Sequence, residues 1–409
     1  MATSPADGAG LRLLRVVVGM VAAATCARAV WHGWIDTLWV GTPTRLAYPL
    51  LGWVPVPTRP VLFTLVVGCG LAGLAVALGL AERWMLAVVA FGMLWLGALD
   101  AAAYLNHEVL LVALAGLLAL LPNGRNVPPA AVLAARALVG SVYVWAAVAK
   151  LDAGWLAGQP LRVWLVSRSD LPVVGPLLTR SGVAAALAIA ALAFDALVVP
   201  ALAWRRTRPL ALAAVMAFHA ATAVLFPIGA FPWLMAGAAL GAFAPSWLGW
   251  VPTVRPPGRV GWSIGPRLAA AGIVGLCALA PLRSVLPGSE PAWDGTGDHL
   301  AWRVMDHDRA GLVTWAVTDR ATGATWDERP SDHLAPHQQR QLASTTSLLP
   351  GAARAVRASW ARDGRDVEVR AEVFVSMDGG RARPVVDPSV DLSRVGWTLG
   401  HPSWAVRGA

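Results

Sequence analysis

One short stretch of the chain combines residue types that could carry out proton chemistry. Residues 141–155 read SVYVWAAVAKLDAGW, so a hydrophobic run ends at Lys150 and is followed by Asp152. Lys150 is the only lysine among the 33 Lys and Arg residues of this 409-residue chain. Arginine stays protonated in proteins, whereas a buried lysine amine can become neutral and act as a base. The sequence therefore indicates Lys150 as a candidate base. The alternative is a lysine left by codon bias that anchors the end of the run.

Other ionisable side chains also lie in or beside apolar runs. They are Asp100, the group Asn106-His107-Glu108, Asp195 and His219. Such residues are costly in a membrane span, so they indicate function unless they pair within the helix bundle. We expect His107, Lys150 and His219 to share a site, because histidine transfers protons near neutral pH. For Asp195 we expect a structural hydrogen bond to a neighbouring helix, deep in the bilayer.

Composition places the chain among integral membrane proteins. Hydrophobic residues make up 56% and charged residues 14% of the chain, and its mean hydropathy is +0.57. The net charge of +9 does not indicate a nucleic-acid partner, because residues 290–409 hold 14 Arg against 16 Asp and Glu. The remaining +11 belongs to the hydrophobic part, as membrane topology requires. The three cysteines lie inside apolar runs without metal-ligand spacing and are expected to be core residues; we expect no metal.

The apolar runs predict about nine transmembrane helices, since about 20 residues cross a bilayer. The expected spans are Leu11–Trp31, Val61–Ala81, Trp84–Tyr104, Val109–Leu121, Ala130–Lys150, Gly182–Trp204, Leu210–Phe226, Gly229–Ala244 and Leu268–Leu286. Val109–Leu121 and Gly229–Ala244 are short for a span, so eight is the alternative.

The arginines between the spans predict the orientation. With the N-terminus inside, the inner segments hold Arg12, Arg15, Arg83, Arg125, Arg205, Arg206, Arg208, Arg255, Arg259 and Arg267. The outer segments hold only Arg45, Arg59, Arg162, Arg168 and Arg180. Because cytoplasmic loops carry the excess of Arg and Lys, we expect a multi-pass plasma-membrane protein with a cytoplasmic N-terminus. The Lys150 end of its helix and the C-terminal region then face the extracytoplasmic side.

The C-terminal region predicts a small α+β domain. We divide the chain into a helical domain, 1–287, and an extracytoplasmic domain, 288–409, joined by a Pro/Gly-rich linker near 287–297. Alternating or β-rich runs predict strands at His299–Met305, Leu312–Val317, Asp366–Met377 and Arg383–Val386. Asp378-Gly379-Gly380 predicts a hairpin turn. Helices are expected near Pro336–Leu348 and Ala352–Ala361.

A proline- and glycine-containing segment interrupts one hydrophobic run at its expected outer boundary. It reads FPIGAFPW from Phe226 to Trp233. Irregular backbone at membrane depth must be buried in protein or line a cavity. Its aromatic side chains, Phe231 among them, suit a flat apolar ligand such as a quinone, and an interfacial aromatic belt is the alternative.

Several of these motifs together resemble one enzyme family. AKLDAGW at Ala149–Trp155, YLNH at Tyr104–His107 and FHxxTxxLFPIGAFPW at Phe218–Trp233 are similar to the vitamin K-dependent γ-glutamyl carboxylases and their bacterial relatives, the HTTM proteins. The resemblance extends through Ala301–Met305, Arg320–Gly323, Val373–Met377 and Asp387–Asp391. Nearly the whole chain is covered, in the same order.

The resemblance implies a reaction and roles for individual residues. Lys150 would deprotonate vitamin K hydroquinone or menaquinol. Reaction with oxygen then yields a base strong enough to take the γ-proton of a glutamate, and carbon dioxide traps the carbanion. The role requires a neutral amine, which burial favours. Asn106, His107, Met305 and Phe231 would bind the quinone.

The resemblance also places residues on the substrate side. Trp302, His307 and Arg309 would bind the glutamate, since an arginine fork matches a carboxylate; the alternative for Arg309 is a solvated hairpin residue. The supporting residues are Asp152, Asp195, His219 and Thr222, the last standing where the family commonly has asparagine.

The expected partners are membrane lipid, the quinone and a secreted Glu-containing peptide or protein. Two alternatives stay open. One is a hydroquinone epoxidase without glutamate carboxylation, and the other is a non-catalytic module that binds a quinone or a lipid.

Overall fold

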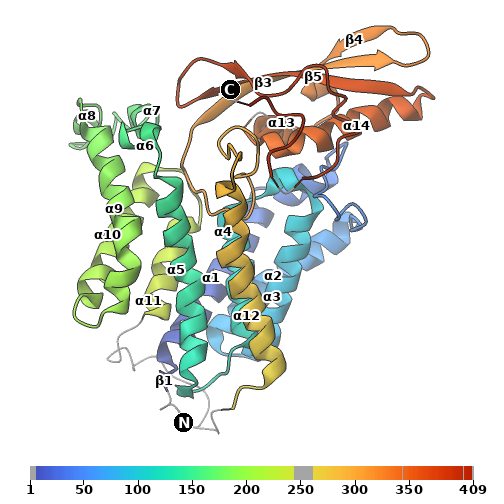
Figure 1. Cartoon of the computed structure of the whole chain (residues 1–409). Helices are drawn as coiled ribbons and strands as arrows, with labels where there is room; N and C mark the ends of the chain where they lie inside the picture. The colour runs from blue at the N-terminus through green and yellow to red at the C-terminus, as the bar shows by residue number, and fades with distance from the viewer. Residues whose placement is uncertain (1–5, 244–260, 343, 399, 408–409) are drawn as a thin grey trace. The chain divides into compact units, whose positions relative to one another are not determined.

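The computed structural model describes residues 6–243, 261–342, 344–398 and 400–407 (Figure 1). The chain divides into two compact units, which we call unit 1 and unit 2. Unit 1 comprises Met1–His32, Leu62–Leu94 and Leu105–Ala280, and unit 2 comprises Gly33–Val61, Trp95–Tyr104 and Pro281–Ala409. Two stretches from the N-terminal half therefore belong to the same unit as the C-terminal region.

Long apolar helices dominate the first two thirds of the chain. Seven in the described residues are long and apolar enough to cross a membrane: α1 (Ala9–Trp31), α2 (Arg59–Leu78), α3 (Glu82–Leu99), α5 (Pro129–Ala149), α9 (Val183–Ala203), α10 (Arg208–Leu225), and α12 (Ile264–Leu279) with its continuation η4 (Ala280–Val285). Two further apolar helices are shorter, α4 (Asn106–Leu120) and α11 (Phe231–Ala242). The expectation of a polytopic helical membrane protein is confirmed, while the crossing of the bilayer by α4 and α11 stays a prediction.

Glycines allow helix α1 to pack closely in unit 1. A Cβ atom on Gly241 of α11 would lie 2.8 Å from Leu14 of α1, and one on Gly237 would lie 2.5 Å from Val17. Another on Gly73 of α2 would lie 2.6 Å from the carbonyl oxygen of Gly19. Small residues at helix contacts are typical of membrane bundles. Lipid removes the hydrophobic driving force between helices there, so van der Waals packing between closely approaching backbones holds them together.

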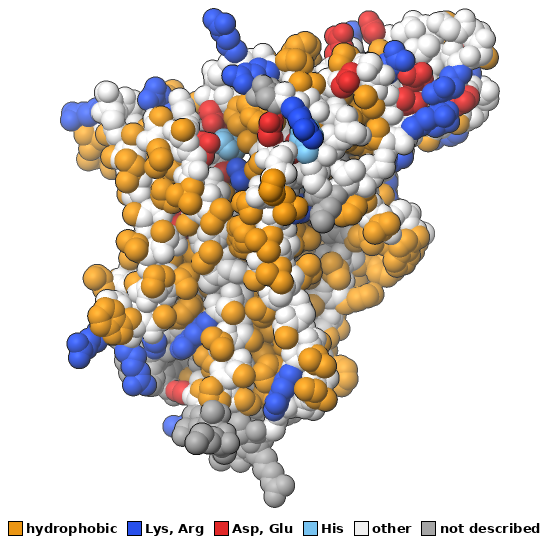
Figure 2. Space-filling model, viewed as in Figure 1, with side chains coloured by type: hydrophobic (Ala, Val, Ile, Leu, Met, Phe, Trp, Pro, Cys, Tyr) orange, Lys and Arg blue, Asp and Glu red, His pale blue; other side chains and the backbone are white. Residues whose placement is uncertain are grey.

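Hydrophobic side chains also cover the outside of the helices. Figure 2 shows them over the surfaces of α5, α9, α10 and α12 that face the viewer. Leu197, Leu210 and Leu268 are 64%, 75% and 65% exposed. Because isolated soluble proteins rarely present so continuous an apolar surface, these are lipid-facing positions.

Short elements complete the helical part and the segments beside it. They are the two-stranded sheet β1 (Ala6–Asp7) with β2 (Asn126–Val127), the helices α6 (Ala153–Leu156), α7 (Leu161–Val166) and α8 (Gly175–Leu178), the π-helical turn η1 (Ile35–Val40), and the 3-10 turn η2 (Ala101–Ala103).

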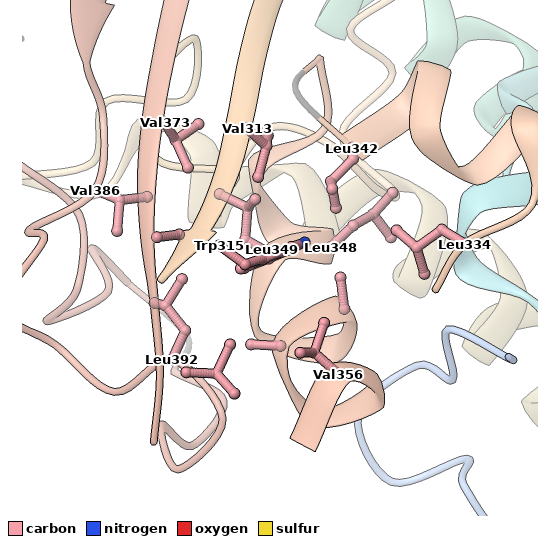
Figure 3. Close-up of a cluster of buried hydrophobic side chains, with 14 of the residues drawn as sticks. Val313, Trp315, Leu334, Leu342, Leu348, Leu349, Val356, Val373, Val386 and Leu392 are labelled. Carbon is pink, nitrogen blue, oxygen red and sulfur yellow. The ribbon is translucent and has the colours of Figure 1, made fainter. Parts of the chain in front are cut away.

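Unit 2 contains a four-stranded antiparallel sheet in the order β4-β3-β5-β6. Its elements are β3 (Arg309–Asp319), β4 (Thr325–Glu328), η5 (Pro330–Asp332), α13 (Pro336–Leu342), η6 (Thr346–Leu348), α14 (Leu349–Arg362), β5 (Val367–Met377) and β6 (Arg383–Pro384). Alternate side chains of β3 and β5 are buried, and with residues of α14 they form one hydrophobic core around Trp315 (Figure 3). This is the expected small α+β domain.

One buried glutamine connects the three chain segments of unit 2. The Gln338 side chain is fully buried on α13. Its Nε2 donates to the carbonyl oxygen of Thr44 at 2.8 Å and to Asp100 Oδ2 at 2.5 Å, while its Oε1 accepts from Ala335 N at 2.9 Å. Buried polar groups stabilise a fold only when they are paired, so these bonds specify how the segments dock.

The structure corrects parts of the predicted C-terminal domain. The expected strand His299–Met305 is wrong, because Leu300, Trp302 and Met305 have positive φ angles of 47°, 52° and 53°, which a strand excludes. Strand β4 was not predicted. The expected helix Pro336–Leu348 is divided into α13 and η6.

The predicted hairpin turn is confirmed. Asp378 and Gly379 have φ angles of 54° and 74°, and Gly380 N donates to the carbonyl oxygen of Met377 at 2.8 Å. Positive φ at both central positions is what a type I′ turn requires.

Two corrections apply to the helical part. The predicted span Trp84–Tyr104 ends at Leu99, after which Asp100 caps η2 by accepting a hydrogen bond from Ala102 N at 2.8 Å. The predicted span Val109–Leu121 begins earlier than expected, because Asn106, His107 and Glu108 form the first turn of α4. Three predicted positions, Ala244, Arg255 and Arg259, lie outside the described residues.

Candidate functional site

The amine of Lys150 is buried within unit 1. Lys150 follows the last residue of α5 and is 6% exposed. Its Nζ donates to Asp195 Oδ2 of α9 at 2.9 Å and to the carbonyl oxygen of Ala146 at 3.3 Å. The Trp155 ring centroid lies 5.1 Å from Nζ, within cation–π range. The only lysine of the chain is therefore held by one carboxylate, one carbonyl and one indole.

Asp152 helps to position the indole beside the lysine. Its carboxylate caps α6 by accepting a hydrogen bond from Trp155 N at 3.1 Å. Trp155 Nε1 in turn donates to the carbonyl oxygen of Ala188 of α9 at 2.8 Å. The KLDAGW segment thus ends one helix, caps the next and fixes its tryptophan on α9.

Lys150 and Asp195 lie at the same level of the helix bundle. The prediction separated them, with Lys150 at the outer boundary and Asp195 deep in the bilayer, but their contact shows that the separation is wrong. Asp195 is about 18 Å along α9 from Val183, at a rise of about 1.5 Å per residue. Because Asp195 lies beside the end of α5, the first part of α9, from Val183 to Asp195, extends past the end of α5 along the bundle. The interhelical hydrogen bond expected for Asp195 is present, and its donor is Lys150.

The segment after Lys150 covers this part of α9. Trp155, Leu161 and Leu165, from helices α6 and α7, form a buried cluster with Ala184 and Ala188 of α9. The segment that follows the lysine is therefore packed against the helix that carries Asp195.

Aromatic side chains of α5, α9 and α10 form a second cluster in unit 1. His219 Nε2 lies 2.9 Å from the hydroxyl oxygen of Tyr143, and the rings of Phe194 and Phe218 stack at 4.1 Å. Tyr143 is two helical turns before Lys150, about 10 Å along α5, so the tyrosine that contacts His219 lies on the face of α5 that carries the lysine.

Two residues of this cluster bear on the sequence predictions. Sequence reasoning missed Tyr143, although its i−7 spacing from Lys150 placed it on the lysine face of the helix. Thr222 Oγ1 donates to the carbonyl oxygen of His219 at 3.0 Å, within the same helix.

The FPIGAFPW segment meets His107. Helix α10 ends at Leu225 and α11 begins at Phe231, so the expected break in the helix is present. Gly229 has a φ angle of 61°, and a Cβ atom there would lie 3.4 Å from Cε1 of His107. The backbone of this segment therefore lies against the imidazole ring. Asn106, just before His107, and Phe231 are partly buried.

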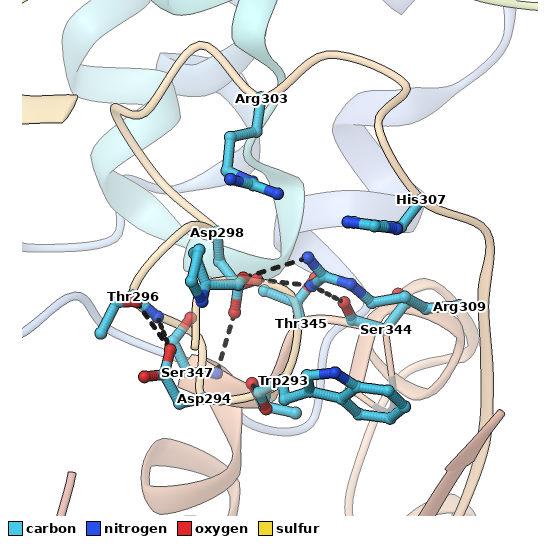
Figure 4. A network of polar contacts seen from close by, with 12 residues as sticks. Trp293, Asp294, Thr296, Asp298, Arg303, His307, Arg309, Ser344, Thr345 and Ser347 are labelled. Atoms are coloured by element: carbon cyan, nitrogen blue, oxygen red, sulfur yellow. Dashed lines mark hydrogen bonds and ion pairs between the residues drawn. The ribbon is translucent and has the colours of Figure 1, made fainter. Parts of the chain in front are cut away.

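Arg309 belongs to a polar network in unit 2 (Figure 4). Its side chain is 11% exposed, and Nη1 donates to Asp298 Oδ1 at 2.8 Å and to the carbonyl oxygen of Ser344 at 2.9 Å. Burial alone would lower the pKa of Arg309, but the carboxylates of Asp298 and Asp306 raise it. The alternative of a solvated hairpin residue is therefore wrong, because the guanidinium is buried and its charge is balanced.

Of the other residues of the predicted glutamate site, His307 lies beside the same network, with Nε2 3.8 Å from Asp306 Oδ2 (Figure 4). His307 Nδ1 lies 3.1 Å from Asp378 Oδ2, and Trp302 is 1% exposed. Met305 is partly buried. Although burial opposes ionisation of Asp306, the Arg303 guanidinium at 2.6 Å lowers its pKa below the ordinary value.

A cavity of about 670 Å³ lies wholly within unit 2. Arg283, His299 and Arg354 are among its lining residues, together with apolar side chains such as Leu46 and Trp404. Arg283 Nε and His299 Nε2 are buried and have no hydrogen-bond partner among the described residues. Burial lowers the pKa of His299, which favours the neutral form of its ring. Two unpaired polar atoms beside a cavity indicate a place for a polar ligand.

Sequence reasoning did not find this cavity. None of Trp302, Met305, His307 or Arg309 is among the described residues that line it. Little in the sequence indicated it, because Arg283 stood near the end of the predicted span Leu268–Leu286 and His299 at the start of a wrongly predicted strand. In the described part of the chain, no three His, Cys, Asp or Glu side chains gather as metal ligands would.

Comparison with known protein families gives two matches. The HTTM domain model matches residues 3–247, which is more than half of the chain. The model of the vitamin K-dependent gamma-carboxylase lumenal domain matches residues 270–407. No curated protein and no solved structure matched the chain.

Proposed function

Because the chain belongs to the vitamin K-dependent gamma-carboxylase family, we propose that it is a membrane enzyme acting on a reduced naphthoquinone and a glutamyl substrate. The proposed reaction consumes vitamin K hydroquinone or menaquinol, oxygen and carbon dioxide, and it carboxylates glutamate in a secreted peptide or protein. When bound, the hydroquinone supplies the electrons for oxygen and thereby the strong base that the γ-carbon requires.

The buried Lys150–Asp195 pair is the observation that carries the proposal. We assign Lys150 Nζ as the acceptor of a hydroquinone hydroxyl proton. In its neutral form the amine donates one N–H to the Asp195 carboxylate and keeps its lone pair free to accept that proton. The ammonium that forms on proton transfer is stabilised by Asp195 at 2.9 Å and by the Trp155 ring at 5.1 Å. An arginine in this place could not enter the neutral state.

The chemistry of unit 1 fits a flat apolar ring with polar oxygens. Burial and the aromatic side chains of Tyr143, Phe194 and Phe218 provide apolar walls, and histidines can bond to ring oxygens. His107, against the open backbone of Gly229, is proposed as a quinone contact together with Asn106 and Phe231 of the same unit. For Met305 of unit 2, the proposed quinone role rests on the family resemblance alone.

Unit 2 is proposed to bind the glutamyl substrate. Trp302, His307 and Arg309 remain the proposed glutamate residues, but Arg309 must then exchange Asp298 for the substrate carboxylate. We propose that the 670 Å³ cavity receives a neighbouring part of the peptide, with the unpaired Arg283 Nε–H as a donor.

The proposed orientation has a cytoplasmic N-terminus and an extracytoplasmic C-terminal domain in the plasma membrane. Its support is the excess of arginine in the inner segments. In Figure 2, Lys and Arg side chains gather at the end of the helices near the N-terminus that Figure 1 marks. The test is cysteine labelling from either side of intact cells at exposed Arg205→Cys and Trp397→Cys. Labelling of the first from outside would contradict the orientation.

The reaction is tested with purified protein, the hydroquinone, oxygen, labelled bicarbonate and a Glu-containing peptide. Lys150→Arg keeps the charge and the Asp195 contact, so it should fold normally. It should lose about 10²–10⁴-fold in epoxide formation, the range typical of a lost general base. Arg162→Lys, an exposed change on the expected same side, is the matched control.

The alternatives give different results in this assay. Epoxide without labelled peptide would leave an epoxidase that does not carboxylate glutamate. Quinone binding without turnover in either protein would leave a non-catalytic module.

A further inference from the structure

A second cavity lies in unit 1, close to the N-terminal end of α1. Its volume is about 300 Å³. It is bounded by the start of α1, the connection from α2 to α3, and the segment before β2. The lining residues are Gly8, Arg12, Arg15, Gly79, Ala81, Glu82, Arg83, Trp84, Asn123 and Gly124. The proposed enzymatic reaction does not use this cavity.

The lining carries an excess of positive charge. Arg12, Arg15 and Arg83 stand against the single carboxylate of Glu82. Arg12 Nη1 lies 2.6 Å from Glu82 Oε1, and Arg15 Nε lies 3.6 Å from Oε2. Since one carboxylate cannot balance three guanidinium groups, the cavity keeps a net charge of about +2 that favours an anion.

Three terminal nitrogens of these arginines, Nη1 and Nη2 of Arg12 and Nη2 of Arg15, already donate to the ends of helices. Arg12 donates to the carbonyl oxygens of Val76 and Ala77 at 3.0 and 2.9 Å, and Arg15 to those of Leu118 and Leu121 at 3.3 and 3.2 Å. These carbonyls belong to the last turns of α2 and α4 or follow them. Both side chains are thereby fixed before any ligand arrives.

One donor of each arginine makes no hydrogen bond, and that of Arg15 has only the longer ion pair with Glu82 at 3.6 Å. The Nε atoms of Arg12 and Arg15 are buried and have no hydrogen-bond partner within the described part of the chain. Arg15 is 2% exposed. A buried guanidinium donor left unpaired is costly, and a phosphate oxygen would satisfy it.

The geometry points to a binding site for a phosphate-bearing anion in this cavity, built by Arg12 and Arg15 with Arg83 at its exposed side. The shared chemistry is a phosphate oxygen accepting guanidinium N–H groups. The source is either the headgroup of an anionic phospholipid, since the cavity lies at the end of membrane helices, or free phosphate.

The test uses delipidated protein in a neutral detergent, with binding followed by native mass spectrometry. The probes are a short-chain phosphatidylglycerol, the matched phosphatidylcholine and inorganic phosphate. Phosphatidylglycerol should bind about tenfold more tightly than phosphatidylcholine, because the choline cation cancels the phosphate charge of the second and only the first carries a net negative charge. If inorganic phosphate binds and phosphatidylglycerol does not, the site stands and its source is free phosphate.

Three variants distinguish this site from general attraction to a basic surface. Arg83→Gln should weaken binding about three- to tenfold, whereas Arg125→Gln, an exposed arginine nearby that does not line the cavity, should change it less than about twofold. Glu82→Gln should tighten binding, because it removes the competing carboxylate. If Arg12 and Arg15 had a purely structural role, Glu82→Gln would not tighten the binding of the anionic probes. Equal effects of Arg83→Gln and Arg125→Gln, or no binding of either anionic probe, would overturn the proposal.

Discussion

Replacing Asp195 by asparagine tests whether Lys150 depends on a buried counter-charge. At 2.9 Å the Coulomb attraction is about 6 kcal/mol for an effective dielectric constant of about 20. Desolvation of both ions cancels much of this attraction, so the pair adds little net stability. Removing one partner is different, because the other charge stays buried and unpaired.

We therefore expect Asp195→Asn to lower the free energy of unfolding by about 3–5 kcal/mol. The double variant Lys150→Met/Asp195→Asn removes both charges and should restore most of the loss, and Lys150→Met alone is the second single variant. The measurement is reversible unfolding in mixed micelles, followed by tryptophan fluorescence, for wild type, both single variants and the double variant. The resulting cycle isolates the coupling between the two side chains.

The chain provides a matched control in an exposed pair of similar geometry. Asp36 and Arg59 approach to 2.5 Å, but their side chains are 47% and 60% exposed. Asp36→Asn should leave the unfolding free energy unchanged within the error of the measurement, because solvent screens this pair. If Asp195→Asn is as mild as Asp36→Asn, or if the double variant is no more stable than Asp195→Asn, the reasoning about a buried ion pair is refuted.

Two further predictions concern unit 2. Burial raises the pKa of the Asp100 carboxyl to about 6, although the hydrogen bonds from Ala102 and Gln338 lower it in part. The folded state therefore binds the carboxyl proton more tightly than the unfolded state does. Its stabilising contribution is complete below pH 3.8 and is lost as the pH rises through about 6. Asp100→Asn should therefore flatten the fall in melting temperature between pH 4 and pH 7, and an unchanged slope would contradict the assignment. In the core, Leu349→Ala should cost about 2–5 kcal/mol in chemical denaturation, whereas Leu312→Ala, 68% exposed, should cost less than about 0.5 kcal/mol, and equal costs would disprove the packing described.

Local patterns predicted the elements of the fold well. Apolar runs of membrane length gave the helices, because hydrophobicity over some twenty residues is a local property. The Asp378–Gly379 turn was predictable for the same reason, since its backbone needs residues that accept positive φ. The strand expected at His299–Met305 failed, because its alternation of apolar and polar residues arises from turns with positive φ at Trp302 and its neighbours. Periodicity alone does not distinguish these conformations.

The candidate site was predicted only in part. The uniqueness of Lys150 identified it, and its motif gave Asp152 and Trp155 as neighbours in sequence. The pairing with Asp195 and the contact of Tyr143 with His219 join residues 45 and 76 positions apart. Nothing local specifies which helices meet, or at what level.

The sequence by itself determined that this is a helical membrane protein of a carboxylase family and that one lysine is set apart. Composition, spacing and motif order are properties of the chain before it folds. Only the tertiary structure decided that Asp195 balances Lys150 and that Gln338 binds three distant segments into unit 2. It also showed that Arg309 is already paired with Asp298. These facts depend on helix packing and loop docking, where long-range burial selects among many locally acceptable arrangements.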